Sequence, residues 1–231
     1  MSIAKSVKIS DKAAKAAARK EGWDRYKASL RYALHVITHP FDGFWDLTHE
    51  NKGTMAAAHT FLILFLITRV LKLTVTNFQF ISAPIQHINV FEEMGSLLLP
   101  FLILCLANWA MTTLFEGKGR LKDIYIAMCY ALVPYVLLQL PMVILSNMLT
   151  FEEASFYSVM LSISVIWCVF LVFVGLMEVH DYSPGKTLVF LVVTVVGAAA
   201  IIFLLLVFFS LLSDAFSFFV SFYREASYRL H

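Results

Sequence analysis

The chain has 231 residues, of which 60% are hydrophobic and 15% are charged, and its formal net charge is +2. An average soluble domain is about 45–50% apolar and about 25% charged, so this composition excludes an ordinary soluble globular protein. The apolar residues lie in blocks of about twenty, which is the length needed to cross the roughly 30 Å hydrocarbon core of a bilayer. We therefore expect an all-α, polytopic membrane bundle with five transmembrane helices, and nothing indicates a nucleic acid as a partner.

Residues 1–53 are expected to form an N-terminal segment outside the membrane whose main element is an amphipathic helix. Ser10 or Asp11 can cap this helix, and apolar side chains recur every three or four residues from Trp23 to Ile37. Basic side chains occupy the other faces. Such a helix can lie among the headgroups of an anionic leaflet, or its apolar stripe can pack on the transmembrane bundle, and the pattern leaves both open.

His39-Pro40 is expected to end this helix, because the residue before proline disfavours the helical conformation, and Pro40 can begin a second short helix. Aromatic residues surround this point, just before the first span. Aromatic side chains in that position are typical of a belt at the membrane interface. The predicted interface anchors are Trp23, Phe41, Phe44 and Trp45.

A transmembrane domain of five spans is expected over residues 54–212, because long apolar blocks recur there with short connections. The predicted spans are residues 54–74, 95–115, 124–149, 156–177 and 187–212. The third span contains Pro134 and Pro141, and two prolines in one span predict a kinked or broken helix. Residues 213–231 show polar side chains at helical spacing, so the fifth helix is expected to continue into a C-terminal helical tail.

The placement of basic residues predicts the orientation, because Lys and Arg near membrane ends are retained in the cytoplasm. Ten of them lie in residues 1–53, and others lie in the connections 116–123 and 180–186. The connections 77–94 and 150–154 contain none. This alternation predicts a cytoplasmic N-terminus and an extracytoplasmic C-terminus.

Two cations interrupt the first span, and two acids stand near the start of the second. Arg69 and Lys72 are three residues apart and so share a helix face, at the depth expected for Glu92 and Glu93. We predict an interhelical ion pair between the two clusters. The alternative is that both cations extend to the outer headgroups without a partner.

Other polar groups have simple structural explanations. Glu178, His180 and Asp181 cluster at a helix end before a turn, which we interpret as solvated, since no further ligand completes a metal set. Asn108 and Gln139 lie at membrane depth, where such residues usually form interhelical hydrogen bonds.

No arrangement of side chains indicates catalysis, a metal or a cofactor, so we expect a protein that is not an enzyme. The segment 117–119, Gly-Lys-Gly, resembles part of a phosphate loop, but no strand precedes it and the first glycine is missing. The three cysteines fall inside apolar blocks, where they are expected to act as small apolar side chains.

Three stretches together carry a resemblance to a known family. They are Val36-Ile-Thr-His-Pro-Phe-Asp-Gly-Phe-Trp-Asp-Leu47, Tyr130-Ala-Leu-Val-Pro-Tyr135 and Gly175-Leu-Met-Glu-Val-His-Asp-Tyr-Ser-Pro-Gly-Lys-Thr187. With five spans and a kinked third helix, the chain resembles a bacterial member of the Yip1 domain family over about residues 38–212. The eukaryotic relatives bind small GTPases in Golgi and endoplasmic-reticulum membranes, but no residue here matches a GTPase contact. The resemblance implies a non-enzymatic protein of the bacterial plasma membrane that works through partners or lipid.

The leading hypothesis is therefore an accessory or scaffold subunit of another membrane complex, with an ABC-type solute importer as one possible partner. Membrane lipids are the other expected partners. Two alternatives stay open: a small transporter or channel, because broken helices are where transporters place substrate sites, and a lipid-binding or membrane-shaping protein, because the N-terminal helix is basic and amphipathic.

Overall fold

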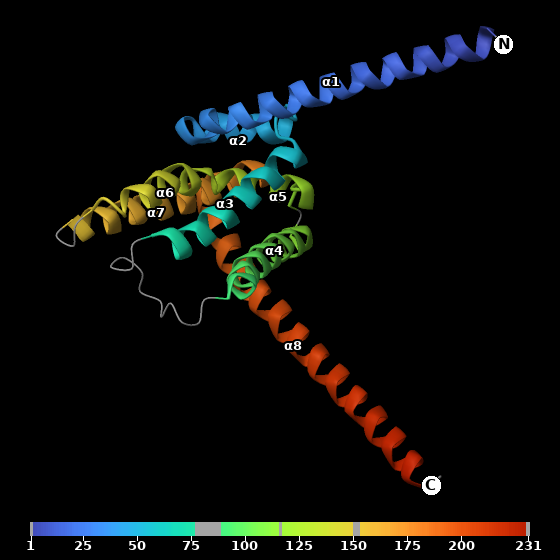
Figure 1. Ribbon diagram of the computed structural model, residues 1–231. Coiled ribbons are helices and arrows are strands. Elements are labelled where there is room, and N and C mark those ends of the chain that lie inside the picture. The colour runs from blue at the N-terminus through green and yellow to red at the C-terminus, as the bar shows by residue number, and fades with distance from the viewer. Residues whose placement is uncertain (1, 77–88, 116, 150–152, 230–231) are drawn as a thin grey trace.

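The computed structural model describes residues 2–76, 89–115, 117–149 and 153–229, and within these ranges it contains helices and no strand (Figure 1). The helices are α1 (Ser2–Thr38), α2 (Pro40–His49), α3 (Met55–Val75), α4 (Val90–Leu114), α5 (Leu121–Ala131), α6 (Val133–Leu145), α7 (Ala154–His180) and α8 (Pro184–Arg229). The all-α prediction is confirmed.

Five segments are long and apolar enough to cross a bilayer, as the sequence predicts. They are Met55–Val75, Val90–Leu114, Leu121–Leu145, Ser155–His180 and Pro184–Glu225. The second span begins earlier than predicted, because Asn89 caps it by accepting from the backbone N–H groups of Phe91 and Glu92. The last span continues well beyond residue 212 without a break.

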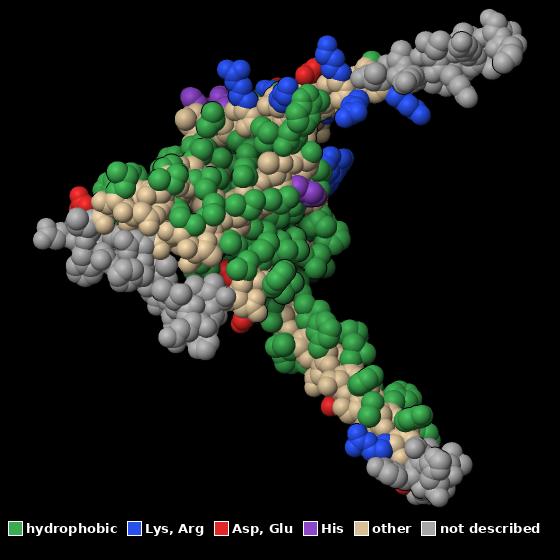
Figure 2. Space-filling view, viewed as in Figure 1, with side chains coloured by type: hydrophobic (Ala, Val, Ile, Leu, Met, Phe, Trp, Pro, Cys, Tyr) green, Lys and Arg blue, Asp and Glu red, His purple; other side chains and the backbone are tan. Residues whose placement is uncertain are grey.

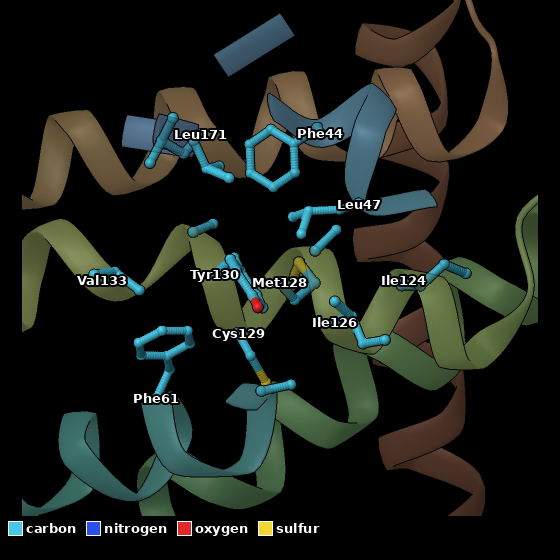
Figure 3. Packing of buried hydrophobic residues seen from close by; sticks show 14 of the residues in the cluster. Phe44, Leu47, Phe61, Ile124, Ile126, Met128, Cys129, Tyr130, Val133 and Leu171 are labelled. Atoms are coloured by element: carbon cyan, nitrogen blue, oxygen red, sulfur yellow. The ribbon is translucent and has the colours of Figure 1, made fainter. Parts of the chain in front are cut away.

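The core is built around α5, the first half of the third span. Phe44 and Leu47 of α2 lie on one side of α5, and Phe61 of α3 lies on the other (Figure 3). Leu171 of α7 and Tyr130 of α5 have no exposed surface. The short helix α2 is therefore part of the same apolar core as the spans.

The third span is interrupted between its two halves. Helix α5 ends at Ala131, and α6 begins at Val133 with Pro134 in its first turn. Pro134 has no N–H to donate to the carbonyl of Tyr130, four residues earlier. Just before it, the N–H of Leu132 bonds to Cys129 O at 3.3 Å, only three residues back. The break therefore lies at Leu132, two residues before Pro134, whereas Pro141 lies inside α6.

Helix α1 begins at Ser2, ahead of the predicted caps at Ser10 and Asp11, and ends at Thr38 before the predicted break at His39-Pro40. Its second half packs on the bundle, whereas its first half projects past it (Figure 1). The packed half is held by a buried polar contact: Ser29 Oγ lies 2.6 Å from Tyr130 OH and accepts from Thr54 N at 3.0 Å. Packing on the bundle thus applies to the second half of the helix, and a position of the first half among the headgroups stays a prediction.

Helix α8 is longer than a bilayer requires. Its 46 residues span about 69 Å at about 1.5 Å per residue, against a hydrocarbon core of about 30 Å. The first part packs on α4, where Met111 contacts Gly197. Every residue from 202 to 225 is exposed, and Figure 1 shows this part extending away from the bundle.

Candidate functional site

The charged residues of the first two spans do not all meet. Arg69 Nε donates to Glu93 Oε1 at 2.7 Å, and less than a third of each side chain is exposed. Lys72 instead lies over the ring of Tyr157, with its ammonium 5.5 Å from the ring centroid. Among the described residues, neither cation is within ion-pair distance of Glu92, which is exposed. The contact thus links α3 to α4 through one pair of the four predicted residues.

Reversing one charge of this pair should destabilise the bundle. Arg69→Glu places a carboxylate against Glu93, and we expect the free energy of unfolding to fall by about 1–3 kcal/mol, the range for a half-buried charged hydrogen bond. Adding Glu93→Arg should restore most of the loss, whereas adding Glu92→Arg should not. The free energy of unfolding of the single variant and the two double variants is measured in mixed micelles. If Glu93→Arg and Glu92→Arg restored stability equally, a specific Arg69–Glu93 pair would be contradicted.

The ends of three spans meet in a buried hydrogen-bonded chain. His180 of α7 places Nε2 at 2.9 Å from Asn108 Oδ1 of α4. Asn108 Nδ2 donates to Thr194 Oγ1 of α8 at 3.0 Å, and Thr194 Oγ1 donates to Phe190 O at 2.7 Å. These three side chains, His180, Asn108 and Thr194, are at most 3% exposed. We call them the α4–α7–α8 junction.

The direction of every bond in the junction follows from one backbone group. The N–H of Gly119 points to His180 Nδ1 at 3.2 Å, and because an N–H only donates, Nδ1 must carry a lone pair. The ring proton therefore lies on Nε2 and is donated to Asn108. The prediction of a solvated helix end is wrong for His180, which is enclosed and saturated, although Asp181 is exposed.

The glycines of segment 117–119 are required by packing at this junction. A Cβ on Gly117 would lie 2.7 Å from Thr112 Cβ, and a Cβ on Gly119 would lie 2.6 Å from His180 Nδ1. Between them, Lys118 Nζ donates to Asp181 Oδ2 at 2.9 Å. The likeness to a phosphate loop thus reflects a close approach between the α4–α5 connection and α7.

The Lys118–Asp181 ion pair lies on the exposed side of the same junction. The hydrogen bond from Lys118 holds the pKa of the Asp181 carboxyl below its usual range. A carboxylate with a lowered pKa contributes its stabilisation above its ordinary pKa and loses it as the pH falls through the lowered value. Both side chains are more than half exposed, so this contact adds little to stability.

The predicted interface anchors divide into two groups. Trp23, Phe41 and Trp45 are 56%, 51% and 44% exposed, so their rings are available to a membrane interface. Phe44 has no exposed surface and packs on α7, where a Cβ added to Gly175 would lie 3.0 Å from Phe44 Cε1. Phe44 therefore cannot contact lipid, and its role is to dock α2 on the bundle.

Two polar side chains inside the bundle form hydrogen bonds between helices. Asn108 bonds to Thr194, and Gln139 Nε2 of α6 donates to Ser164 Oγ of α7 at 3.1 Å, as predicted for polar residues at membrane depth. Among the residues that the structure describes, no three His, Cys, Asp or Glu side chains are placed to hold a metal ion. The exposed surfaces include the described part of α1 and the far half of α8.

Comparison with known proteins gives one match. The model of the Yip1 domain family matches residues 34–220, which is most of the chain. The matched region includes α2, the first four spans, the α4–α7–α8 junction and most of α8, which forms the fifth span. No curated protein and no solved structure matches the chain.

Proposed function

Since the chain belongs to the Yip1 domain family, we propose that this integral membrane protein is a non-enzymatic accessory or scaffold subunit of another membrane complex. The observation that carries the proposal is the far half of α8. Residues 202–225 are exposed all round the helix, and hydrophobic side chains lie along most of the face that Figure 2 shows, with polar and charged side chains between them. A helix that leaves its own bundle and keeps an apolar surface is suited to packing against another protein.

Helix α8 is too long for the lipid of one bilayer to cover its whole exposed surface. Residues 184–200 pack beside the bundle, and residues 202–225 add about 36 Å at about 1.5 Å per residue, more than a second crossing of the hydrocarbon core requires. Phe216, Phe219 and Tyr223 lie near the far end and are 68–77% exposed. Aromatic side chains exposed in a cluster are typical of protein contact sites.

The distribution of charge supports an orientation in the bacterial plasma membrane. Lys and Arg lie along the described part of α1 in Figure 2, and the α4–α5 connection with Lys118 meets α7 at the end of the bundle where α2 docks. We place this end in the cytoplasm, because basic residues near membrane ends are retained there. The far half of α8 then points toward the outer side.

A partner on α8 is tested by photo-crosslinking in the native membrane. A crosslinking residue at Phe219 is expected to capture one membrane protein, whereas the same residue at Ile166, a 66% exposed position on α7, is expected to capture none or lipid. Phe216→Ala with Phe219→Ala should abolish co-purification of that partner without changing the folding of the exposed helix. An ABC-type solute importer is the partner that we would look for first. Purification of the protein alone in several mild detergents would contradict the proposal.

The rival hypothesis of a small transporter or channel has weaker support. Asn108 and Gln139 donate to neighbouring helices, and interhelical hydrogen bonds are the ordinary role of such residues. The break at Leu132 has packed core residues on both sides, Ala131 and Val133. Flux of ions or common solutes through proteoliposomes that contain only this protein would favour transport instead.

A further inference from the structure

A cleft separates the projecting half of α1 from the start of α3. Its volume is about 1020 Å³, and Lys15, Arg19, Lys20, Trp23 and Tyr26 of α1 form one wall. The opposite wall is the first turns of α3, and the two walls meet where Tyr26 OH lies 3.0 Å from Thr60 Oγ1. The cleft therefore lies beside the point where the chain enters the membrane.

The charges of this cleft have one sign. Among the described residues that line it, three are basic and none is acidic. A neighbouring groove on the same helix differs, because Glu21 and Asp24 stand there beside Lys20 and Arg25. The charged side chains that line the cleft are thus basic, whereas those of the neighbouring groove have mixed charge.

The walls change from basic to apolar in the direction of the bilayer. Along α1 the lining passes from Lys15 and Arg19 to Trp23, whose ring stacks on Tyr26 at 5.4 Å. On α3 the lining residues Ala56 and Thr60 share a helix face with Ile63 and Ile67, which are 55% and 46% exposed. A ligand in the cleft thus meets cations first and then a continuous exposed stripe of the first span.

Gly22 gives a further indication that the cleft is kept open. A glycine inside a helix costs about 1 kcal/mol relative to alanine. A Cβ at Gly22 would meet no described atom within 4 Å, so no packing contact within the described protein requires the missing side chain. The space beside Gly22 belongs to the cleft.

We infer that this cleft binds an anionic glycerophospholipid of the leaflet on which α1 lies. Lys15, Arg19 and Lys20 hold the phosphate of the headgroup, Trp23 lies at the interface, and an acyl chain follows the α3 stripe from Ala56 to Ile67. Binding would fix the projecting half of α1 against the membrane surface. This site does not depend on a partner at α8.

The test uses the full-length protein in nanodiscs with defined lipids. Wild type is expected to retain phosphatidylglycerol over phosphatidylcholine, measured by native mass spectrometry of the released protein. Lys15→Gln with Arg19→Gln should weaken retention by about tenfold or more, since each basic residue near a membrane surface contributes substantially to binding. Arg25→Gln with Arg31→Gln removes the same charge from other faces of α1 and should leave retention within about twofold.

A second pair of variants tests whether lipid retention depends on the space in the cleft as well as on its charge. Gly22→Leu should fill the cleft and reduce retention without changing any charge, whereas Gly22→Ala should leave it nearly unchanged. Equal retention of the two lipids by wild type, or equal loss in both double variants, would overturn the site. Displacement of the lipid by inorganic phosphate at millimolar concentration would assign the cleft to a free anion. All variants keep the far half of α8, so crosslinking at Phe219 tests the partner separately.

Discussion

Replacing Phe44 with alanine should lower the free energy of unfolding by about 3–5 kcal/mol, the range for removing a large buried aromatic side chain. Phe44 has no exposed surface, and its ring packs on Gly175 of α7. Figure 3 shows the ring pointing into the apolar layer between α2 and the spans. Among the described residues of α2, Phe44 is the only large side chain that is fully enclosed. Its removal therefore leaves a cavity.

The matched control lies on the same helix. Phe41→Ala removes the same side chain from a position that is 51% exposed, so we expect a loss below about 1 kcal/mol. Both variants are compared by thermal or denaturant unfolding in one detergent, where lipid contacts are equal. A loss for Phe41→Ala as large as that for Phe44→Ala would show that α2 is held mainly by the interface.

The second large effect is expected at Gly119. Gly119→Ala places a Cβ 2.6 Å from His180 Nδ1 and 2.8 Å from Val179 Cγ1, and the enclosed ring has little room to move. We expect a loss of about 1–3 kcal/mol, the usual range for overpacking a filled core. Gly185→Ala is the control, because a Cβ there meets no described atom within 4 Å.

A double-mutant cycle shows whether the loss passes through His180. His180→Ala should itself destabilise the protein by about 1–3 kcal/mol, because it leaves Asn108 Oδ1 and the Gly119 N–H without partners in a buried place. In that background Gly119→Ala has room for its methyl group, so its own effect should shrink markedly. Strictly additive losses would mean that the two residues do not act on each other.

The sequence was sufficient for features that depend on local chemistry. The number of spans follows from the length of the apolar blocks, and the break before α2 follows from His39-Pro40. The interruption of the third span follows from Pro134, which lacks the N–H that a continuous helix needs. In each case the residue that determines the feature lies within it.

Features that depend on a distant partner could not be obtained in this way. An aromatic residue before a span suits an interface anchor as well as a docking side chain, and only the position of Gly175 on α7 distinguishes Phe44 from Phe41. His180 is similar, since its partners Asn108 and Gly119 come from other elements. The glycines of segment 117–119 were the available signal, because a short connection that excludes Cβ atoms indicates a close neighbour.

The enclosed position of the third span has a consequence for how the protein is made. Within the described residues, 61% of the most apolar stretch of Leu121–Leu145 is buried inside the bundle, against 33% or less of the corresponding stretch of each other span. Ribosomes deliver α5 and α6 to the membrane before α7 has been synthesised, so the most protein-covered span enters the bilayer with one of its covering helices missing. Biogenesis therefore passes through a stage in which Gln139 lacks Ser164 of α7, its hydrogen-bond partner, and faces lipid or the insertion machinery until α7 arrives.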